Sequence, residues 1–294
     1  MDQAEKLRNI IKNQSGSQNS LARVITITSG KGGVGKTSTA VNLALQLSKL
    51  GNKVIIIDAD FGLANIEVML GIRPEYTLAD VMLRGKSIKE AITTGPGNVG
   101  FLSGGSGIKE LANMDKEQVL SFIKKLSELD NMADIIIIDT GAGISDAVME
   151  FVVASEEVFV VATPEPTSIT DAYALLKTLN RNGNFEKGKS SIKLIGNRVQ
   201  KYEDGEELFE KLSLVVRKFL GIDLSLLGMV KYDEKCQKSI MKQTPVSIEY
   251  PNAVSAKDYE KIAYKINYWS DNINVENARG IRGLFSSVIR KKLS

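Results

Sequence analysis

The chain has 294 residues, 43% of them hydrophobic, which is enough to bury the core of one large α/β domain with short appendages. A net charge of +3 does not by itself predict nucleic-acid binding, and one cysteine, Cys236, excludes an intrachain disulfide and a paired-cysteine cluster. There is no histidine, no signal-peptide pattern and no run of about 20 apolar residues, so we expect a cytoplasmic protein whose proton transfers use carboxylates, lysine or water.

The first 20 residues are predicted to form a short helix and a flexible tether. Ala4, Leu7 and Ile10 would share one side of a helix over 1–13, and residues 14–20 are polar and contain glycine and serine. A helix this short is marginal on its own. It is therefore either a segment that docks into a groove of a partner or a frayed terminus.

Residues 30–37 form a phosphate loop. They read Gly-Lys-Gly-Gly-Val-Gly-Lys-Thr, between a β-branched run at 24–28 and a helical pattern over 37–50. Backbone N–H groups at such a helix start hold phosphates, while Lys36 reaches the terminal phosphates and Thr37 binds Mg²⁺. The residues predicted to bind the nucleotide here are Gly32, Gly33, Val34, Gly35, Lys36, Thr37 and Ser38.

Two further features of the loop bear on its function. Gly30, Gly32 and Gly35 also fit the Gly-x-Gly-x-x-Gly pattern of dinucleotide sites, with Asp58 at the place of the ribose-binding acid. However, a lysine and a threonine in the first helical turn serve a metal–phosphate site. A second lysine, Lys31, is placed where its charge could reach phosphates bound by a facing copy of the chain. The loop therefore predicts dimerisation around nucleotide.

Residues 21–271 are predicted to form an α/β domain with a mostly parallel central sheet flanked by helices on both faces. Continuous apolar runs indicate strands covered on both faces and joined by right-handed crossovers. Ligands of such sheets bind at the carboxyl ends of the strands. The predicted strands are 24–28, 54–57, 99–102, 135–138, 158–162, 192–195 and 224–228, and predicted helices include 115–129, 167–181 and 254–270.

Two of the predicted strands end in aspartate. We expect Asp139 to hold Mg²⁺ through a water, with support from Asp58, because an acid that closes a strand beside a phosphate loop suits that role. Asp60 lies two residues further along and is better placed to orient an attacking water or accept its proton. Alternatively, these acids cap turns and helices. Two such acids beside one phosphate loop favour a Mg²⁺ and catalytic site over capping roles.

The base is predicted to be adenine, because the Asn-Lys-x-Asp sequence that reads guanine does not occur. Asn197 follows the strand 192–195 and offers an amide to an adenine edge, and Arg198 can lie against the ring. On chemistry alone, both could equally be ordinary turn residues.

Residues 272–294 are predicted to be a polar linker and an amphipathic helix too short to span a bilayer. This helix could dock on the protein's own core. The polar linker, the helix-weakening Gly280 and Gly283 and the basic end instead favour a segment that is unfolded in water and folds on acidic lipid. The residues predicted to contact the membrane are Ile281, Leu284, Phe285, Val288, Ile289, Arg290, Lys291 and Lys292. Two copies in a dimer would bind more tightly than one.

Three segments carry a family resemblance. The loop Lys31–Thr37, the segment Asp58–Asn65 and the segment Asp139–Gly143 resemble the nucleotide and switch motifs of the MinD/ParA group of deviant phosphate-loop ATPases. The resemblance extends along nearly the whole chain. Within the group the chain looks most like the FlhG regulators of flagellar number and placement, also called FleN or YlxH, because it carries the N-terminal motif Asp-Gln-Ala-x-x-Leu-Arg.

The resemblance implies an ATPase switch that uses ATP, ADP and Mg²⁺ and forms a homodimer. It implies that catalysis involves Lys31 acting across the dimer, Lys36 and Asp60. Asn197 and Arg198 match the adenine position of the group, and 281–293 matches its membrane-targeting helix, which would hold the protein reversibly on anionic lipids of the inner membrane face.

Further partners follow from the same resemblance. The N-terminal motif would stimulate the GTPase of the SRP-type partner FlhF, and the residues implied are Asp2, Gln3, Ala4, Leu7 and Arg8. The resemblance also implies flagellar basal-body C-ring components or a flagellar transcription regulator as partners. It implies no specific nucleic acid as a partner. The other hypotheses are a MinD-type division-site regulator, a ParA-type DNA-partitioning ATPase, and a metabolic phosphotransferase or reductase.

Overall fold

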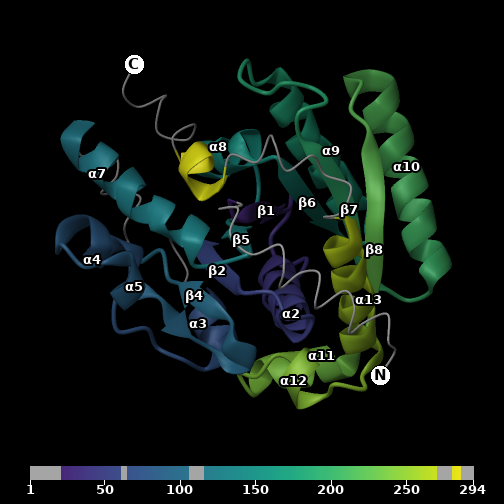
Figure 1. Cartoon of the computed structure of the whole chain (residues 1–294). Coiled ribbons are helices and arrows are strands. Elements are labelled where there is room, and N and C mark those ends of the chain that lie inside the picture. The colour runs from purple at the N-terminus through teal and green to yellow at the C-terminus, as the bar shows by residue number, and fades with distance from the viewer. Residues whose placement is uncertain (1–20, 61–64, 106–115, 270–279, 286–294) are drawn as a thin grey trace.

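The computed structural model describes residues 21–60, 65–105, 116–269 and 280–285, which build an eight-stranded sheet with helices on both faces. The strand order is β3-β4-β2-β5-β1-β6-β7-β8 (Figure 1). Neighbouring strands are parallel except β3 and β4, which pair antiparallel at one edge. The predicted α/β fold with a mostly parallel sheet is confirmed.

The elements alternate along the chain as a doubly wound sheet requires. The strands are β1 (Arg23–Thr28), β2 (Val54–Ala59), β3 (Thr93–Thr94), β4 (Gly100–Leu102), β5 (Ile135–Thr140), β6 (Glu157–Ala162), β7 (Ser191–Val199) and β8 (Leu224–Lys231). The α-helices are α2 (Lys36–Lys49), α3 (Asn65–Leu70), α4 (Leu78–Leu83), α5 (Ile88–Ala91), α7 (Lys116–Leu126), α8 (Asp146–Ala154), α9 (Pro166–Arg181), α10 (Tyr202–Leu220), α11 (Glu234–Met241), α12 (Val246–Glu249) and α13 (Val254–Trp269). Short 3-10 helices are η1 (Pro96–Asn98) and η2 (Ser127–Asn131).

The strands β2 and β5 bring the predicted acids together. Each has four consecutive isoleucine or valine residues before its aspartate and is buried at every position. Such a strand must be covered on both faces, which places it inside the sheet. In the parallel register Asp58 lies opposite Asp139, so both acids reach the same carboxyl edge.

The two faces of the sheet carry separate helical layers, which can be followed along β6 because its side chains alternate. Phe159 and Val161 join the apolar cluster under α2 and α13, whereas Val158 and Val160 join the cluster under α8, α9 and α10. Figure 1 shows α2 and α13 on one side of the sheet and α8 and α9 on the other. The helix that begins at the phosphate loop, α2, is therefore a central core element.

The C-terminal segment differs from expectation where it is described. Residues 280–285 are helical and packed on the protein itself, between α7 and α8 (Figure 1). Ile281, Leu284 and Phe285 are at most 3% exposed, and the Phe285 ring meets Phe122 and Phe151 edge-on at centroid distances of 6.2 and 5.6 Å. The expectation of an unfolded segment is wrong for these residues, because an apolar groove in the domain covers their stripe.

One carboxylate fixes the start of this C-terminal turn. Asp130 in η2 accepts hydrogen bonds from the backbone N–H groups of Ile281 at 2.8 Å and Arg282 at 3.5 Å. Gly280 has φ +58°, and a Cβ there would lie 2.5 Å from the Asp130 carboxylate. Asp130 thus acts as a helix cap supplied from elsewhere in the chain. No helix within the described ranges is both long and apolar enough to cross a bilayer.

Candidate nucleotide site

The phosphate loop lies between β1 and α2, as predicted, and its glycines are sterically required. Gly33 and Gly35 have φ values of +76° and +96°, a region that side chains with a Cβ disfavour. A Cβ on Gly35 would lie 2.3 Å from the Asn197 amide nitrogen, and one on Gly30 would lie 2.0 Å from the Asp171 carbonyl oxygen. The loop is thus pressed between the end of β7 and helix α9.

The loop is also tied to the segment that follows β5. The Gly143 N–H donates to the Ser29 carbonyl at 2.9 Å, and the Ser29 hydroxyl donates to the Lys31 carbonyl at 2.7 Å. Residues of two sequence motifs predicted to act together are therefore in direct contact. This contact connects the phosphate loop to the carboxyl end of the strand that carries Asp139.

Lys36 is a buried cation at the start of α2, with 8% of its surface exposed. Burial lowers the pKa of its amino group, while the nearby carboxylates of Asp139 and Asp60 raise it. The Lys36 amino group is therefore held near two carboxylates. This environment suits a group whose charge is satisfied by phosphate oxygens.

The paired acids Asp58 and Asp139 are strongly perturbed. Burial, and after it the negative charge of the neighbouring Asp139, raise the pKa of Asp58 to about 8. Burial raises the pKa of Asp139 to about 7, opposed by the Thr37 hydroxyl and the Lys36 amino group. Among the described residues, neither carboxylate oxygen of Asp139 accepts a hydrogen bond of normal geometry, although the Thr37 hydroxyl lies close enough to lower its pKa. An orphaned buried carboxylate beside a threonine hydroxyl and a phosphate loop fits a Mg²⁺ ligand set.

Asp60 occupies the outer part of the same edge. Its backbone N–H donates to Asp58 at 3.0 Å, and its carboxylate accepts from the Asn65 amide at 3.1 Å. An ideal Cβ built on Gly141, which follows β5, would lie 3.5 Å from the Asp60 carboxylate. Asp60 is half-buried and stands at the junction of the segments after β2 and β5. Its role as the water-orienting group stays a prediction.

Asn197 reaches the loop, but with a role that the sequence did not indicate, and Arg198 contacts Asn197. The two residues lie inside β7, not after it. The Asn197 amide nitrogen donates to the Val34 carbonyl at 2.7 Å, and its carbonyl oxygen accepts from the Arg198 N–H at 2.9 Å. Arg198 itself has φ +55° and is exposed. Asn197 therefore holds the phosphate loop. A bound base would approach the Asn197 side chain while its amide nitrogen donates to Val34.

Other contacts were missed by sequence reasoning. Tyr259 of α13 is 1% exposed and lies against Ser38 and Thr39 in the first turn of α2, and burial raises the pKa of its hydroxyl. The Cys236 thiol, which is half-buried, is 3.7 Å from the Ser255 hydroxyl in the same cluster. These residues lie about 200 positions from the loop in sequence, and no short motif marks them.

Lys31 is the predicted residue whose surroundings are most informative. Its amino group lies 3.1 Å from the Glu165 carboxylate and 2.8 Å from the Thr167 hydroxyl, both at the start of α9. In this single chain the lysine is thus held by its own subunit.

The predicted site residues outside the described ranges are Asp2, Gln3, Ala4, Leu7, Arg8, Val288, Ile289, Arg290, Lys291 and Lys292.

Comparison with known proteins agrees with this geometry. A family model described as an AAA domain matches residues 22–192. The antiactivator FleN of Pseudomonas aeruginosa is 39% identical over 247 residues, covering 84% of this chain and 87% of FleN. The flagellum site-determining protein YlxH of Helicobacter pylori is 31% identical over 276 residues, covering 89% of each chain.

A solved structure connects the same fold to its ligand. The septum site-determining protein MinD of Pyrococcus horikoshii, complexed with Mg-ADP, superposes with a TM-score of 0.66 at 26% identity, over 85% of this chain and 98% of that one. Nucleotide and Mg²⁺ binding are thus properties of this structural family. The fold, the phosphate loop and these relatives together show that the chain belongs to the MinD/ParA family of AAA-domain ATPases.

Proposed function

We propose that this chain is an ATP-dependent switch in which ATP and Mg²⁺ join two copies and hydrolysis separates them. The observation that carries the proposal is the Asp139 carboxylate, buried and without a hydrogen-bond partner among the described residues, next to Lys36 and Thr37. A buried acid in that state is costly for the nucleotide-free protein. A bound cation would relieve that cost, so the site is arranged for its ligands.

The side chains divide the chemistry of hydrolysis among them. Thr37 and Asp139 would hold Mg²⁺, which when bound neutralises charge on the phosphates. Lys36 would stabilise the negative charge that shifts toward the leaving phosphates. Asp60 would orient a water and accept its proton. Asn197 would keep the loop in shape through Val34, with adenine against Asn197 and Arg198.

We further propose that the switch regulates flagellar number and placement. Support comes from the similarity to FleN and YlxH over more than four-fifths of this chain. A flagellar transcription regulator or C-ring components would then be partners of the ATP-bound form. The N-terminal motif Asp2–Arg8 would stimulate the GTPase of an FlhF-type partner.

Removing residues 2–8 tests the partner-activating segment. We expect the truncated chain to keep its ATPase activity and its ATP-dependent dimerisation, because the truncation leaves the folded domain intact. Stimulation of an FlhF-type GTPase, measured as phosphate release, should fall to the basal rate. The matched control removes some of residues 14–20, so that the tether is shorter and the N-terminal motif is kept. Full stimulation by the chain that lacks 2–8 would refute the role of the motif.

We also propose that the C-terminal helix attaches the dimer to anionic lipid after it leaves its groove. The same apolar residues, Ile281, Leu284 and Phe285, are buried in the fold and predicted to insert into lipid. Either environment removes them from water at about 2 kcal/mol per side chain, so apolar burial alone favours neither state. The balance is set by polar terms. Asp130 favours docking through its two hydrogen bonds to the turn, an advantage reduced by the burial that raises the pKa of its carboxyl, and basic residues favour the membrane by about 1 kcal/mol each.

Reversing the charge of Arg290, Lys291 and Lys292 to glutamate should abolish sedimentation with anionic liposomes in Mg-ATP. This triple change spares the docked turn, so nucleotide binding serves as the control for folding. Asp130→Asn should have the opposite effect and raise sedimentation without ATP several-fold, because it weakens the cap of the turn. Unchanged sedimentation of the charge-reversed chain would contradict the anchor. A DNA-binding assay run in parallel distinguishes this function from that of a chromosome-partitioning ATPase.

A further inference from the structure

We propose that the outer face of α10 is a self-association surface, on which two copies of the chain pair their α10 helices antiparallel across a two-fold axis. Leu214 of one copy would meet Leu214 of the other, with an ion pair between Glu210 and Lys218 on each side. The pairing needs no nucleotide and goes beyond the proposed switch, in which ATP joins the copies.

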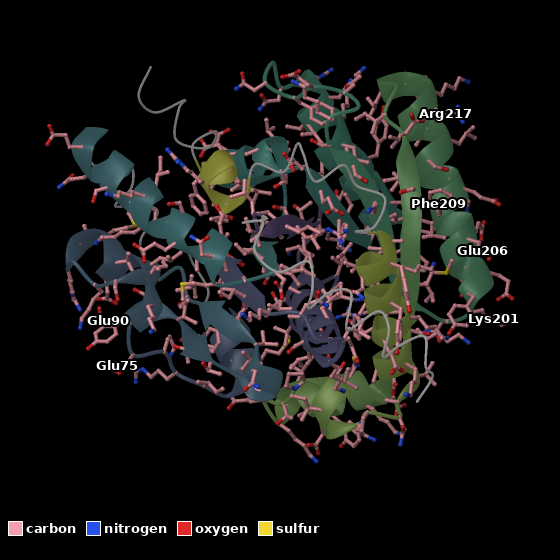
Figure 2. The ribbon with its side chains drawn as sticks, viewed as in Figure 1. Glu75, Glu90, Lys201, Glu206, Phe209 and Arg217 are labelled. Carbon is pink, nitrogen blue, oxygen red and sulfur yellow. The ribbon has the colours of Figure 1, made fainter. Side chains whose placement is uncertain are left out.

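Helix α10 lies at the rim of the molecule. Strand β8 ends the strand order of the sheet, and Figure 1 shows α10 beside it at the outer rim. The residues of α10 that face inward belong to the apolar cluster under α8 and α9, and they are Leu208, Leu212, Val216 and Leu220. Figure 2 shows Glu206 and Arg217 of the same helix at the outer rim. The other face of α10 is therefore directed to solvent in the single chain.

Three residues on this outer face form a short stripe. Glu210, Leu214 and Lys218 are spaced by four residues, so their side chains lie one above another on the helix. All three are exposed, and Leu214 is 68% exposed. A single exposed leucine is common on a protein surface. Here the leucine lies midway between an acid one turn before it and a base one turn after it.

The two flanking charges have no ionic partner in their own subunit. Neither the Glu210 carboxylate nor the Lys218 amino group is in an ion pair with another described residue, whereas the neighbouring Glu207 and Lys211 pair at 2.5 Å. The helix dipole favours acids in the first turn of a helix and bases in the last turn. It accounts for Lys218 but not for an acid in the middle of the helix.

A second copy supplies the missing partners. In an antiparallel pair centred on Leu214, the residue four positions before the leucine lies opposite the residue four positions after it. Glu210 of each copy then meets Lys218 of the other, and the same contact forms twice, as two-fold symmetry requires. A parallel pair would instead place Glu210 against Glu210, which repels. The charges therefore select the antiparallel arrangement.

The contact is small, so we expect it to be weak. One leucine and one ion pair from each copy's face bury less than a standard interface, and we expect a dissociation constant on the order of 0.1–1 mM. The surface is separate from the phosphate loop, which lies between β1 and α2 at the centre of the sheet. A chain with two different two-fold surfaces can build open rows. In one consequence that rests on the proposed function, rows of ATP-joined dimers would hold many membrane-binding segments together.

The experiment reverses charges in the full chain and measures association by sedimentation equilibrium without nucleotide, at up to about 1 mM protein. We expect Glu210→Lys and Lys218→Glu each to raise the dimer dissociation constant at least about tenfold, because both ion pairs become repulsive. The chain that carries both changes should recover the wild-type value, because each pair is restored with its polarity reversed. An equimolar mixture of the two single variants should also associate.

The matched control makes the same changes of net charge on α11, where Glu234 and Lys238 form an exposed pair at 3.8 Å. Glu234→Lys and Lys238→Glu should leave the dissociation constant unchanged. A wild type that stays monomeric at about 1 mM would overturn the surface, and so would a double variant on α10 that associates no better than the single variants.

A second readout in Mg-ATP separates this inference from the proposed switch. Light scattering should show wild-type particles larger than a dimer, whereas Glu210→Lys should stop at the dimer. Wild type that associates without nucleotide and does not respond to ATP would contradict the switch and support the α10 pairing. Equally large particles of wild type and Glu210→Lys would overturn the pairing and leave the switch intact.

Discussion

Asp60→Ala should lower the ATPase rate by about 10²–10⁴-fold and leave a dimer that persists in Mg-ATP. The carboxylate stands at the junction of the segments after β2 and β5, where it accepts from Asn65 and approaches Gly141. Removing it takes away the group that orients and deprotonates water and leaves Lys36 and the phosphate loop in place. Nucleotide binding should therefore be kept while turnover is lost.

The measurement combines phosphate release with light scattering in saturating ATP. Asp223→Ala is the control, because its side chain is 96% exposed and remote from the loop in sequence. On liposomes the Asp60→Ala dimer should remain bound after wild type has been released. A chain that stays monomeric in saturating Mg-ATP would contradict the role assigned to Asp60.

Asp139→Asn should change activity and stability in opposite directions. We expect the ATPase rate to fall about 100-fold or more, because an amide is a poor Mg²⁺ ligand. The nucleotide-free protein should become more stable, since the substitution removes a charge whose burial outweighs the attraction of Lys36 and which repels Asp58. At pH 8 the midpoint of thermal unfolding should rise by a few degrees.

The pH dependence of stability follows from the same acids. Asp58 and Asp139 have folded pKa values of about 8 and about 7, above the value near 4 of an unfolded aspartate. A raised acid pKa contributes stability in full below about pH 4 and loses it as pH rises through 7 and 8. The free energy of unfolding of the nucleotide-free wild type should therefore be lower at pH 8.5 than at pH 6, by an amount on the order of a few kcal/mol, and its unfolding temperature should be lower too.

Asp139→Asn should flatten this pH dependence, because one of the two titrating acids is gone. Differential scanning fluorimetry between pH 5.5 and 8.5 gives the comparison, with Asp223→Asn as the control. Mg-ADP should stabilise wild type most at high pH, where both acids are ionised and can share a cation. An Asp139→Asn chain with the wild-type pH profile would show that Asp139 is not the perturbed group.

Local sequence was sufficient to predict the parallel strands of the sheet and the position of the phosphate loop, but not the short antiparallel strand β3. The isoleucine runs that end at Asp58 and Asp139 define buried parallel strands, and parallel strands place their carboxyl ends together. The phosphate loop is a contiguous motif whose conformation depends on its own glycines. These features depend on neighbours in the chain or on a general rule of sheet geometry.

The contacts that were not predicted join distant parts of the chain. Lys31 meets Glu165 across 134 positions, Asn197 meets Val34 across 163, and Asp130 meets Ile281 across 151. Two of these pairs use a backbone group of the partner, and the third joins two common charged residue types, so nothing in the sequence marks one partner for the other. The C-terminal stripe shows the same limit: periodicity predicts that one face is covered, but not by what.

The position of β1 gives the phosphate loop an unusual sensitivity. This strand lies between β5 and β6, so the loop after it contacts Gly143 on one side and Asp171 of α9 on the other. A small shift of either half of the molecule against the other would alter the spacing of the phosphate-binding N–H groups. A partner that moves α9 relative to the segment after β5 should therefore change how long the nucleotide stays bound.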